Sequence, residues 1–342
     1  TRSWYEVEVT PGLKELAIME LSSISPISQI DEIRDGFLVR QASESPLLSL
    51  RTAHAVSRGI AFEVPRPKAL LGDEHFRKLC GIITEHLKSP GLCEARSFRL
   101  SAAGKDSAVF ERLISSLENE IGLRYDAEQG DLFIRIRKSM VVDEGWDVLL
   151  RYGLRPLSKR WWRTQDYRGA LDGPVAAGIA LLTSPGKKQR VLDLCAGSGT
   201  FLIERALIGP ALCLCGSELL EDVVALSQKN AEAAGVAMKM SFQQGDARAL
   251  PFSDQEFDVV FGNLPWGEAC GSKPALKALY IDIVHEAVRV CAPGGQILFL
   301  TQAHGVLRGV VGELGEGICL ESERTFFQGG FHPRLFVLRK LK

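Results

Sequence analysis

The sequence contains no uninterrupted apolar run of about 18 residues, the length that suggests a membrane-spanning helix. Its N-terminus also lacks the basic segment followed by an apolar one that marks a secretory leader. A membrane or secreted protein is therefore not expected, and a cytoplasmic one is. Net charge is nearly absent as well, at −1, so total charge favours neither an acidic nor a basic partner.

The eight cysteines lack the spacing of a metal site. Cys213 and Cys215 lie two residues apart within an expected strand, and no second pair follows at zinc-finger distance. Buried thiols are the simpler interpretation, and no metal is expected.

The length of 342 residues exceeds that of a typical single domain, so at least two hydrophobic cores are expected. Charge is distributed unevenly between the two parts of the chain. Residues 133–168 hold nine Lys or Arg against four acids, whereas residues 191–330 hold nine against seventeen. A surface that binds phosphates is therefore expected outside the second stretch.

Residues 190–207 have the pattern of a strand, a glycine turn and a helix. Residues 191–194 are a short apolar run, Gly197 and Gly199 interrupt it, and apolar residues return at helical spacing from Phe201. Such a turn lets a ligand approach the main chain, and the helix N-terminus points amides at that ligand.

Two phosphate ligands fit this turn poorly. A P-loop needs Lys and then Ser or Thr after its last glycine, but Thr200 and Phe201 follow Gly199. A dinucleotide fingerprint needs a third small residue where Leu202 stands. S-adenosylmethionine is the third candidate, because Asp193 precedes the glycines and suits its ammonium group.

Three further strands each end in a polar residue. Glu218 follows residues 211–217, about 20 residues after the glycine turn, where an acid accepts the ribose hydroxyls. Asp246 follows the third strand and is placed for the adenine amino group, and Asn263 follows the fourth. Ligands of parallel sheets lie beyond the carboxyl ends of the strands. An ordinary tight turn would explain the two glycines but not this ordered series.

Residues 263–267 read Asn-Leu-Pro-Trp-Gly, and the whole series resembles class I S-adenosylmethionine-dependent methyltransferases with an amino-methylating (N/D)-P-P-(Y/F/W) signature. The resemblance implies an α/β, Rossmann-like catalytic domain with a mostly parallel seven-stranded sheet. Helices alternating with strands are typical of such a sheet, and the last two strands, joined at Gly329 and Gly330, suggest an antiparallel edge.

The signature suits methylation of an exocyclic amine, whose lone pair is delocalised into the ring. The side-chain oxygen of Asn263 and the carbonyl of Leu264, held extended by Pro265, can accept the two amine hydrogens, and Trp266 can stack on the base. Cytosine C5 methylation would need a thiolate within a Pro-Cys pair. That pair is absent, so Cys270 is interpreted as incidental.

The N-terminal half is expected to comprise a ferredoxin-like α+β domain over residues 1–66 and a second domain over residues 67–152. The second resembles a THUMP domain, an RNA-binding module of tRNA-modifying enzymes. The matching features are Ser97, Phe98 and Arg99 on one strand, Gly104, the helix from Phe110 to Ile121 and Gly122, and the strand over residues 131–137. A generic ferredoxin-like unit with solvated arginines is the alternative.

Residues 153–171 are interpreted as a linker to a catalytic domain over residues 172–342. Cations and aromatics alternate over residues 159–163, which suits either RNA binding or packing of Trp161 and Trp162 between domains. In THUMP methyltransferases a similar stretch closes over the methionine end of the cofactor, which implicates Asp172. The residues expected to bind the cofactor are Asp172, Asp193, Ala196, Gly197, Gly199, Thr200, Glu218, Leu219, Asp246, Ala247 and Asn263. Those expected to bind tRNA are Arg96, Arg99, Lys105, Arg135, Arg137, Lys138, Lys159, Arg160 and Arg163.

The family implied is that of the THUMP-containing guanine-N2 tRNA methyltransferases. Asn263 at the first position of the signature resembles the branch that modifies guanine 6 of the acceptor stem. The alternatives are guanine 10 of tRNA, an rRNA guanine, adenine, a protein glutamine, or an RNA-binding protein with a vestigial catalytic domain. A monomer is expected, whose fragment from about residue 165 onward binds cofactor but does not methylate tRNA.

Overall fold

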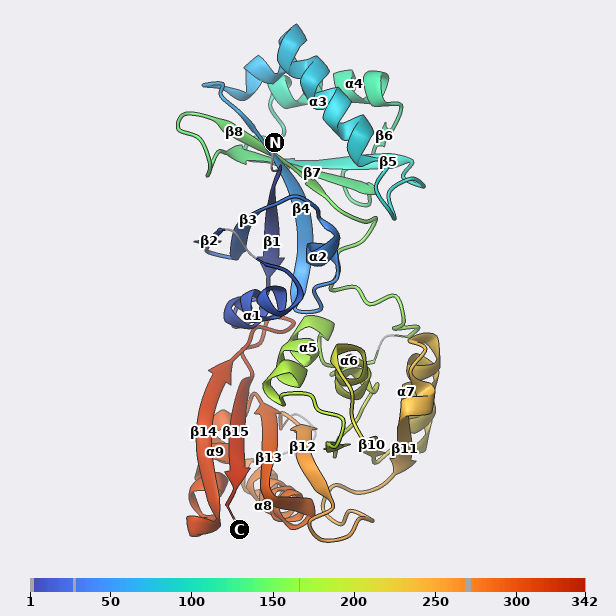
Figure 1. Ribbon diagram of the computed structural model, residues 1–342, viewed down its shortest axis with the longest axis vertical. Helices are drawn as coiled ribbons and strands as arrows, with labels where there is room; N and C mark the ends of the chain where they lie inside the picture. Colours follow the sequence, from blue (N-terminus) through green and yellow to red (C-terminus); the bar gives the residue numbers. More distant parts are fainter. Residues whose placement is uncertain (1–2, 27–28, 166, 268–271, 342) are drawn as a thin grey trace. The chain divides into compact units, whose positions relative to one another are not determined.

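The computed structural model describes residues 3–26, 29–165, 167–267 and 272–341. The chain divides into two compact units, and each is described by itself. The first comprises Thr1–Val9 and Ile18–Lys159, and the second comprises Thr10–Ala17 and Arg160–Lys342. Each unit is built on one β-sheet (Figure 1). None of the described helices has the length and apolar character needed to cross a membrane.

The first unit contains an eight-stranded sheet in the order β2-β3-β1-β4-β8-β7-β5-β6. Its neighbouring strands are antiparallel, except that β5 is parallel to β6 and β7. The strands are β1 Ser3–Val9, β2 Ile30–Ile33, β3 Gly36–Gln41, β4 Ala53–Phe62, β5 Ser97–Ala102, β6 Arg124–Tyr125, β7 Leu132–Lys138 and β8 Trp146–Arg151. The helices are α1 Lys14–Ile24, whose residues up to Ala17 are assigned to the second unit, α2 Ser45–Leu48, the 3-10 helix η1 Pro67–Leu71, α3 Asp73–His86 and α4 Ala108–Ile121.

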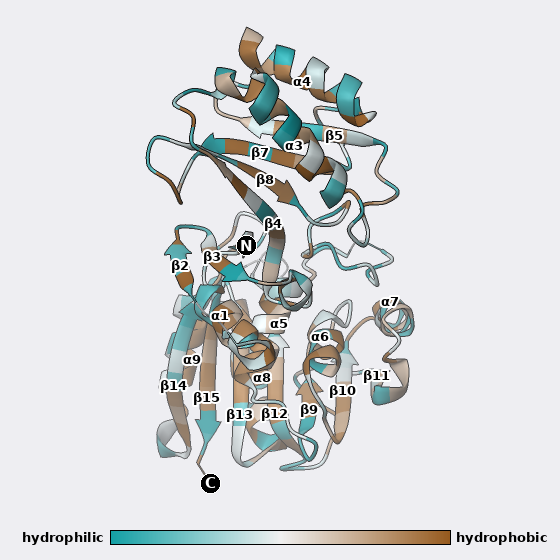
Figure 2. Cartoon of the chain, turned by 45° about the horizontal axis from the view of Figure 1, so that its top comes forward, coloured by the Kyte–Doolittle hydropathy of each residue, from teal (hydrophilic) through white to brown (hydrophobic). Residues whose placement is uncertain are grey.

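Alternation along β7 places one face of this sheet in a core. Leu132, Ile134 and Ile136 are buried together with apolar residues of α3 and α4, and Figure 2 shows the apolar colouring along β7 and β8. Arg135 and Arg137 lie on the opposite face, as the period of two in the sequence predicts. The core is a sheet covered by two helices.

The boundary predicted between residues 66 and 67 lies inside this unit. Strand β4 pairs with β1 on one side and with β8 on the other, so one sheet continues through both predicted domains. Helix α2 ends at Leu48, and residues from Ala53 onward are a strand. Hydrogen bonding of β4 to both β1 and β8 outweighs any local preference of these residues for a helix.

The second unit contains a seven-stranded sheet in the order β11-β10-β9-β12-β13-β15-β14. The pairs among β9 to β13 are parallel, and β15 is antiparallel to both of its neighbours. The expected mostly parallel seven-stranded sheet is thus confirmed. The strands are β9 Arg190–Asp193, β10 Cys213–Glu218, β11 Met240–Gln244, β12 Phe257–Asn263, β13 Cys291–Thr301, β14 Ile318–Thr325 and β15 Arg334–Lys340.

The last two strands form the antiparallel edge that the sequence suggests, with β15 next to β13 and β14 outermost. Residues 335–338 of β15 are buried, whereas most of β14 is exposed. A strand that is apolar on both faces gains most from a central position, and a polar strand tolerates the edge.

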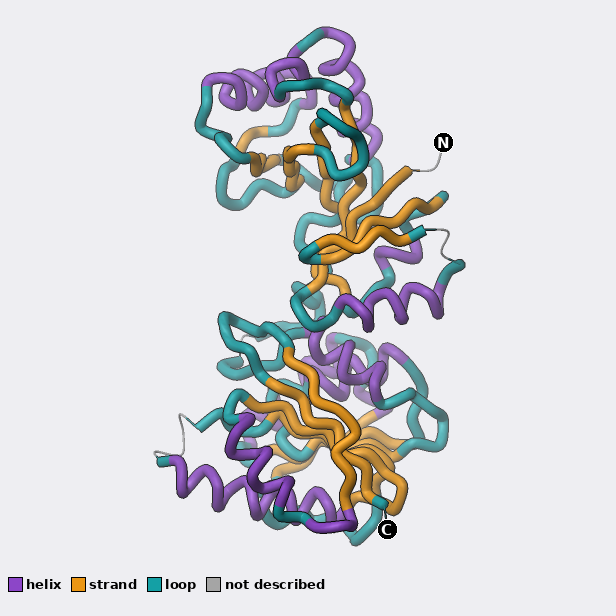
Figure 3. The backbone as a smooth tube through the Cα atoms, turned by 90° about the vertical axis from the view of Figure 1, so that its left-hand side faces the viewer, coloured by secondary structure: helices purple, strands orange, loops and turns teal. Residues whose placement is uncertain are grey.

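Helices cover both faces of this sheet (Figure 3). Phe261 of β12 packs on Phe201 of α6, with ring centroids 4.2 Å apart, while the adjacent Val260 belongs to the core formed with Ile283 and Val284 of α8. Helix α9, which the sequence reasoning missed, lies beside α8. The helices are α5 Gly173–Leu182, α6 Thr200–Ile208, α7 Glu221–Ala233, α8 Lys273–Val290 and α9 His304–Gly312, with the 3-10 helices η2 Ala237–Lys239 and η3 Gly315–Gly317.

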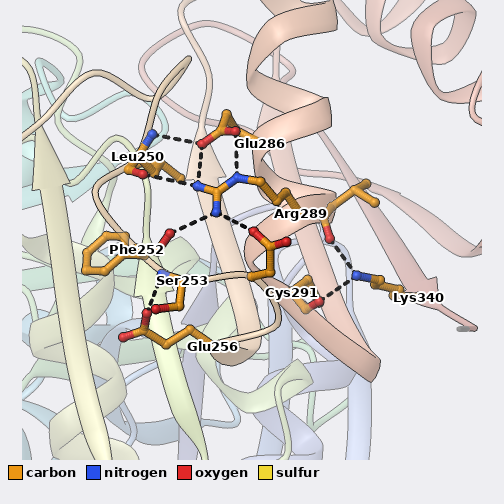
Figure 4. A network of polar contacts seen from close by, with 10 residues as sticks. Leu250, Phe252, Ser253, Glu256, Glu286, Arg289, Cys291 and Lys340 are labelled. Atoms are coloured by element: carbon orange, nitrogen blue, oxygen red, sulfur yellow. Dashed lines mark hydrogen bonds and ion pairs between the residues drawn. The ribbon is translucent and has the colours of Figure 1, made fainter.

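Arg289 near the end of α8 anchors the loop between β11 and β12. Its guanidinium donates to the carbonyls of Leu250 and Phe252 and pairs with Glu286 and Asp254 (Figure 4). The Glu286 carboxylate also accepts from the Leu250 amide at 2.8 Å. Arg289 holds the pKa of Glu286 below its usual range, so both groups stay charged. The network fixes the chain shortly after Asp246.

Candidate active site

The glycine turn connects β9 to α6 as predicted. Gly197 and Gly199 have φ of +51° and +77°, in the left-handed region that favours glycine. A Cβ on Gly199 would lie 3.0 Å from the ring of Phe242, so the turn has no room for a side chain there. Ala196 and Thr200 flank the glycines and are buried. The turn is therefore a tight main-chain cradle at the carboxyl edge of the sheet.

Glu218 ends the neighbouring strand β10 and faces this turn. One carboxylate oxygen accepts from the Gly197 amide at 2.9 Å, and the other accepts from the Leu220 amide at 3.3 Å. The next residue, Leu219, is 57 % exposed. A half-buried acid beside an exposed apolar side chain is a suitable surface for a ribose and an adjoining ring.

Asp193 ends β9 and is only 2 % exposed. One of its oxygens accepts from the Cys195 amide at 3.2 Å. Burial raises the pKa of Asp193 to about 8 against the opposing effect of that amide, and the nearby Glu218 raises it further. A buried acid next to another acid favours a cationic partner, because a positive charge would stabilise its ionised form.

Asp246 lies after β11, whose last residues are held by a hydrogen bond from the Gly245 amide to the Glu218 carbonyl at 2.9 Å. Its carboxylate accepts from the guanidinium of Arg248, with the shortest contact at 2.6 Å, and this partner lowers its pKa. Ala247 beside it is half-buried. Asp246 is thus on the expected edge, and its oxygens already have a charged partner.

Asn263 ends β12, between β9 and β13 in the sheet. Its side-chain Nδ2 donates to the carbonyl of Gly169 at 3.3 Å. Its Oδ1 is buried and has no hydrogen-bond partner among the described residues. A buried acceptor without a donor is costly, so this oxygen is suited to a donor brought by a ligand.

The next three residues have different surroundings. Leu264 donates its amide to the Leu300 carbonyl at 2.9 Å, and its side chain is buried in the core, so only its main chain can serve the site. The carbonyl of Pro265 accepts from the Tyr280 hydroxyl at 2.6 Å. Trp266 is half-buried, and its ring forms a T-shaped pair with Phe331, with centroids 5.4 Å apart.

Residues 167–172, here called the strap, were not expected to contact so much of the site. A Cβ on Gly197 would lie 3.3 Å from the ring of Tyr167, so that ring covers the glycine turn. Burial, and then the charge of Glu218, raise the pKa of Tyr167. The resemblance had implicated Asp172 of the same segment, but an aromatic among turn residues carries no distinct signal in the sequence.

Gln328 is a second residue that the sequence reasoning missed. It lies between β14 and β15 and is only 6 % exposed. Its Oε1 accepts from the Asp172 amide at 3.0 Å, and its Nε2 donates to the Ala170 carbonyl at 3.4 Å. A lone glutamine beside two glycines reads as a turn residue, so only the fold indicates its contacts.

Two residues expected to bind tRNA make contacts within the second unit instead, Arg160 with a buried side chain and Arg163 with a half-buried one. Arg160 pairs with Glu204 at 2.7 Å, and the exposed fractions of the two side chains are 5 % and 0 %. Arg163 donates to the Leu171 carbonyl at 2.6 Å and to the Thr200 hydroxyl at 2.9 Å. The prediction of phosphate contacts is corrected for both, because these guanidinium groups satisfy buried acceptors.

The remaining cations expected to bind tRNA lie in the first unit, in three different surroundings. Arg135 pairs with Glu6 and Glu8, and Arg137 pairs with Glu6, which is 1 % exposed. These pairs neutralise both arginines, so the structure does not support them as phosphate contacts. Arg99 stacks on Phe133 with its guanidinium 4.3 Å from the ring centroid. The expected cations that are exposed are Arg96, Lys105, Lys138 and Lys159.

The described residues contain no group of three or more His, Cys, Asp or Glu arranged to hold a metal ion. The seven described cysteines all carry thiols, of which Cys93 and Cys319 are exposed rather than buried as expected. Burial raises the pKa of Cys195, at the glycine turn, well above its ordinary value, so it is not a thiolate nucleophile. Cys270 lies outside the described residues.

Sheet order, glycine turn and the polar residues at the ends of β9, β10 and β12 define a class I methyltransferase. The family model described as "RMKL-like, methyltransferase domain" matches residues 160–318. The chain is 30 % identical to a tRNA (guanine(6)-N2)-methyltransferase of Thermus thermophilus, over 99 % of this chain and all of that protein. It is 25 % identical to one of Archaeoglobus fulgidus, over 96 % and 90 %.

A solved structure gives the same result. The crystal structure of TrmN from Thermus thermophilus superposes with a TM-score of 0.78 at 29 % identity, covering 99 % of this chain and 100 % of that one. The chain therefore belongs to the tRNA (guanine(6)-N2)-methyltransferase family.

Proposed function

We propose that the protein transfers a methyl group from S-adenosylmethionine to the exocyclic N2 of guanine 6 in the acceptor stem of tRNA. The observation that carries the proposal is the buried Oδ1 of Asn263, which lacks a donor among the described residues. An amine hydrogen of a guanine base would supply that donor. Family membership over the full chain supports the same substrate.

The residues present fit the cofactor. Asp193 is a buried acid suited to an ammonium group, and Glu218 is an acceptor suited to ribose hydroxyls. Gly197 and Gly199 allow the tight turn that brings the main chain beside Glu218, under the ring of Tyr167. Leu219 and Asp246 would contact the adenine. When bound, S-adenosylmethionine supplies a methyl group on a positively charged sulfur.

The chain's own contribution is to orient the amine and the base. Oδ1 of Asn263 and the carbonyl of Leu264 would accept the two amine hydrogens, which directs the nitrogen lone pair away from both. Trp266, which packs in a T-shaped arrangement with Phe331, would stack on the unpaired base and stabilise it by about 1–3 kcal/mol. The extra proton then leaves to solvent or through Asn263 and its neighbours.

Exposed cations are proposed to bind the tRNA backbone. Arg96, Lys105, Lys138 and Lys159 keep accessible charges, which Arg135 and Arg137 do not. Neutralising phosphates releases counterions, so the affinity would fall as the salt concentration rises. Trp161 is 72 % exposed while Trp162 is fully buried. Packing therefore accounts for Trp162, whereas Trp161 is accessible to an unpaired base.

The test is mass mapping of nucleosides in tRNA incubated with the protein and labelled S-adenosylmethionine. N2-methylguanosine is expected at position 6 and should be absent from a transcript with another base there. Asn263→Ala is the matched inactive control. Label at guanine 10, in rRNA, on adenine or on a protein glutamine would replace the proposed target with that one.

A further inference from the structure

We propose that Gln328 is a positioning residue for the methyl transfer: it holds the strap so that the Gly169 carbonyl orients the side-chain amide of Asn263. The inference deepens the proposed function and rests on it. Gln328 lies far from the signature in sequence and is linked to it through the strap.

The carboxamide of Gln328 forms two hydrogen bonds with the main chain of the strap. Its Oε1 accepts from the Asp172 amide at 3.0 Å and its Nε2 donates to the Ala170 carbonyl at 3.4 Å. A primary amide carries an acceptor and donors on one planar group, so a single side chain fixes both main-chain groups. Gly169 directly precedes Ala170 in the chain, and its carbonyl accepts a hydrogen bond from Nδ2 of Asn263 at 3.3 Å.

Gln328 is itself held rigidly by a tight turn. Gly329 and Gly330 have φ of +56° and +86°, and the amides of Gln328 and Phe331 each donate to the other's carbonyl at 2.9 Å. Two successive left-handed residues match a type I′ hairpin turn, which explains the glycine pair. Phe331 at the end of the same turn contacts Trp266. One turn thus supports both the amide and the aromatic ring of the signature.

The orientation of Asn263 decides whether its amide can serve the amine. Only its NH₂ can donate to the Gly169 carbonyl, so Oδ1 is directed toward the other side, where it lacks a partner among the described residues. A reversed amide would present hydrogens to the amine hydrogens and could not accept them. Loss of these two hydrogen bonds should therefore slow the transfer step by more than it weakens cofactor binding, to which Asp172 of the strap is expected to contribute.

Gln328→Glu is the sharpest test, because it keeps the acceptor for the Asp172 amide and replaces the donor to the Ala170 carbonyl. The single-turnover rate on tRNA is expected to fall about 10- to 100-fold, the effect of a small misplacement at a reactive centre. Any rise in the dissociation constant of the cofactor, which Asp172 is expected to bind, should be much smaller than this fall, and the rate should stay low at saturating cofactor and tRNA.

A pH profile separates positioning from general damage. The rate of Gln328→Glu, relative to the native protein, should rise as pH falls, because the protonated carboxyl regains a donor. Gln328→Leu should stay slow at every pH. Gln41→Glu is the matched control: Gln41 is similarly buried, at 7 % exposure, but lies in the first unit, and its variant should show no relative pH dependence.

Hydrogen exchange gives a readout independent of activity. The Asp172 amide should exchange faster in Gln328→Leu than in the native protein, and Gln328→Glu should resemble the native protein. Native rates together with native exchange in Gln328→Leu would overturn the inference. A native protein that methylates no tRNA would instead refute the proposed function, and the exchange measurement would still decide whether Gln328 holds the strap.

Discussion

Replacing Arg160 by Ala should destabilise the second unit rather than weaken tRNA binding. The Nε of Arg160 lies 2.7 Å from an oxygen of Glu204, and both side chains are buried. A Cβ on Gly173 would lie 2.4 Å from the same nitrogen, so the guanidinium packs directly on the first residue of α5. Arg160 thus connects the start of the unit to α5 and α6.

The cost follows from leaving Glu204 buried without this partner. Removing one member of a buried ion pair costs about 3–5 kcal/mol, because the remaining charge loses its compensation. In a unit of about 190 residues, each kcal/mol lowers Tm by roughly 2–4 °C. The expected fall in Tm is therefore about 6–20 °C, a range that thermal unfolding followed by circular dichroism resolves easily.

The neighbouring Lys159 is exposed and provides the control. Lys159→Ala should leave Tm within about 1 °C, because surface substitutions rarely matter to stability. The same variant should bind tRNA more weakly, and its tRNA affinity should depend less steeply on salt concentration. The double variant Arg160→Met with Glu204→Leu should recover much of the lost stability, since neither charge is then buried alone. Native Tm together with weakened tRNA binding in Arg160→Ala would refute the reasoning and restore the tRNA contact.

Four further predictions concern the site and the RNA surface. Glu218→Ala should weaken S-adenosylmethionine binding by roughly 1.5–3 kcal/mol in calorimetry, the cost of losing a charged acceptor; an unchanged affinity would remove its assignment to the ribose. Asn263→Ala should abolish single-turnover methylation while cofactor affinity stays nearly intact, and a retained rate would disprove the amine mechanism. The pKa of Asp193 is raised from 3.8 to about 8, so its contribution to the stability of the cofactor-free protein is full below about pH 4 and lost as pH rises through about 8. Asp193→Asn should flatten that part of the Tm–pH profile, and an unaltered profile would contradict the raised pKa. Lys105→Glu with Lys138→Glu should weaken tRNA binding in a salt-dependent way without affecting cofactor binding, which filter binding at several salt concentrations would check.

The fragment expected to bind cofactor by itself needs a different boundary. The second unit includes Thr10–Ala17 as well as the chain from Arg160 onward. The Phe327 amide donates to the Pro11 carbonyl at 3.2 Å, and a Cβ on Gly178 would lie 2.5 Å from the side chain of Leu13. A fragment starting near residue 165 lacks these contacts and the Arg160 pair, so it would be less stable than the intact unit.

Periodicity and local chemistry in the sequence determined the catalytic fold and the order of its polar residues. Short apolar runs that alternate with helical patterns predict a parallel sheet, and such a sheet brings residues that follow its strands to one edge. Asp193, Glu218, Asp246 and Asn263 could therefore be named without a structure. The cradle was predictable for a similar reason, because Gly197 and Gly199 adopt a backbone conformation that few other residues tolerate.

Only the tertiary structure decided which partner each remaining polar residue meets. Arg160 and Lys159 are adjacent cations in the sequence, yet one is buried against Glu204 and the other is exposed. Gln328 accepts a hydrogen bond from the amide of Asp172, which lies 156 residues earlier in the chain. Local pattern cannot predict such contacts, because they depend on how β15 inserts between β13 and β14 and brings its turn to the strap.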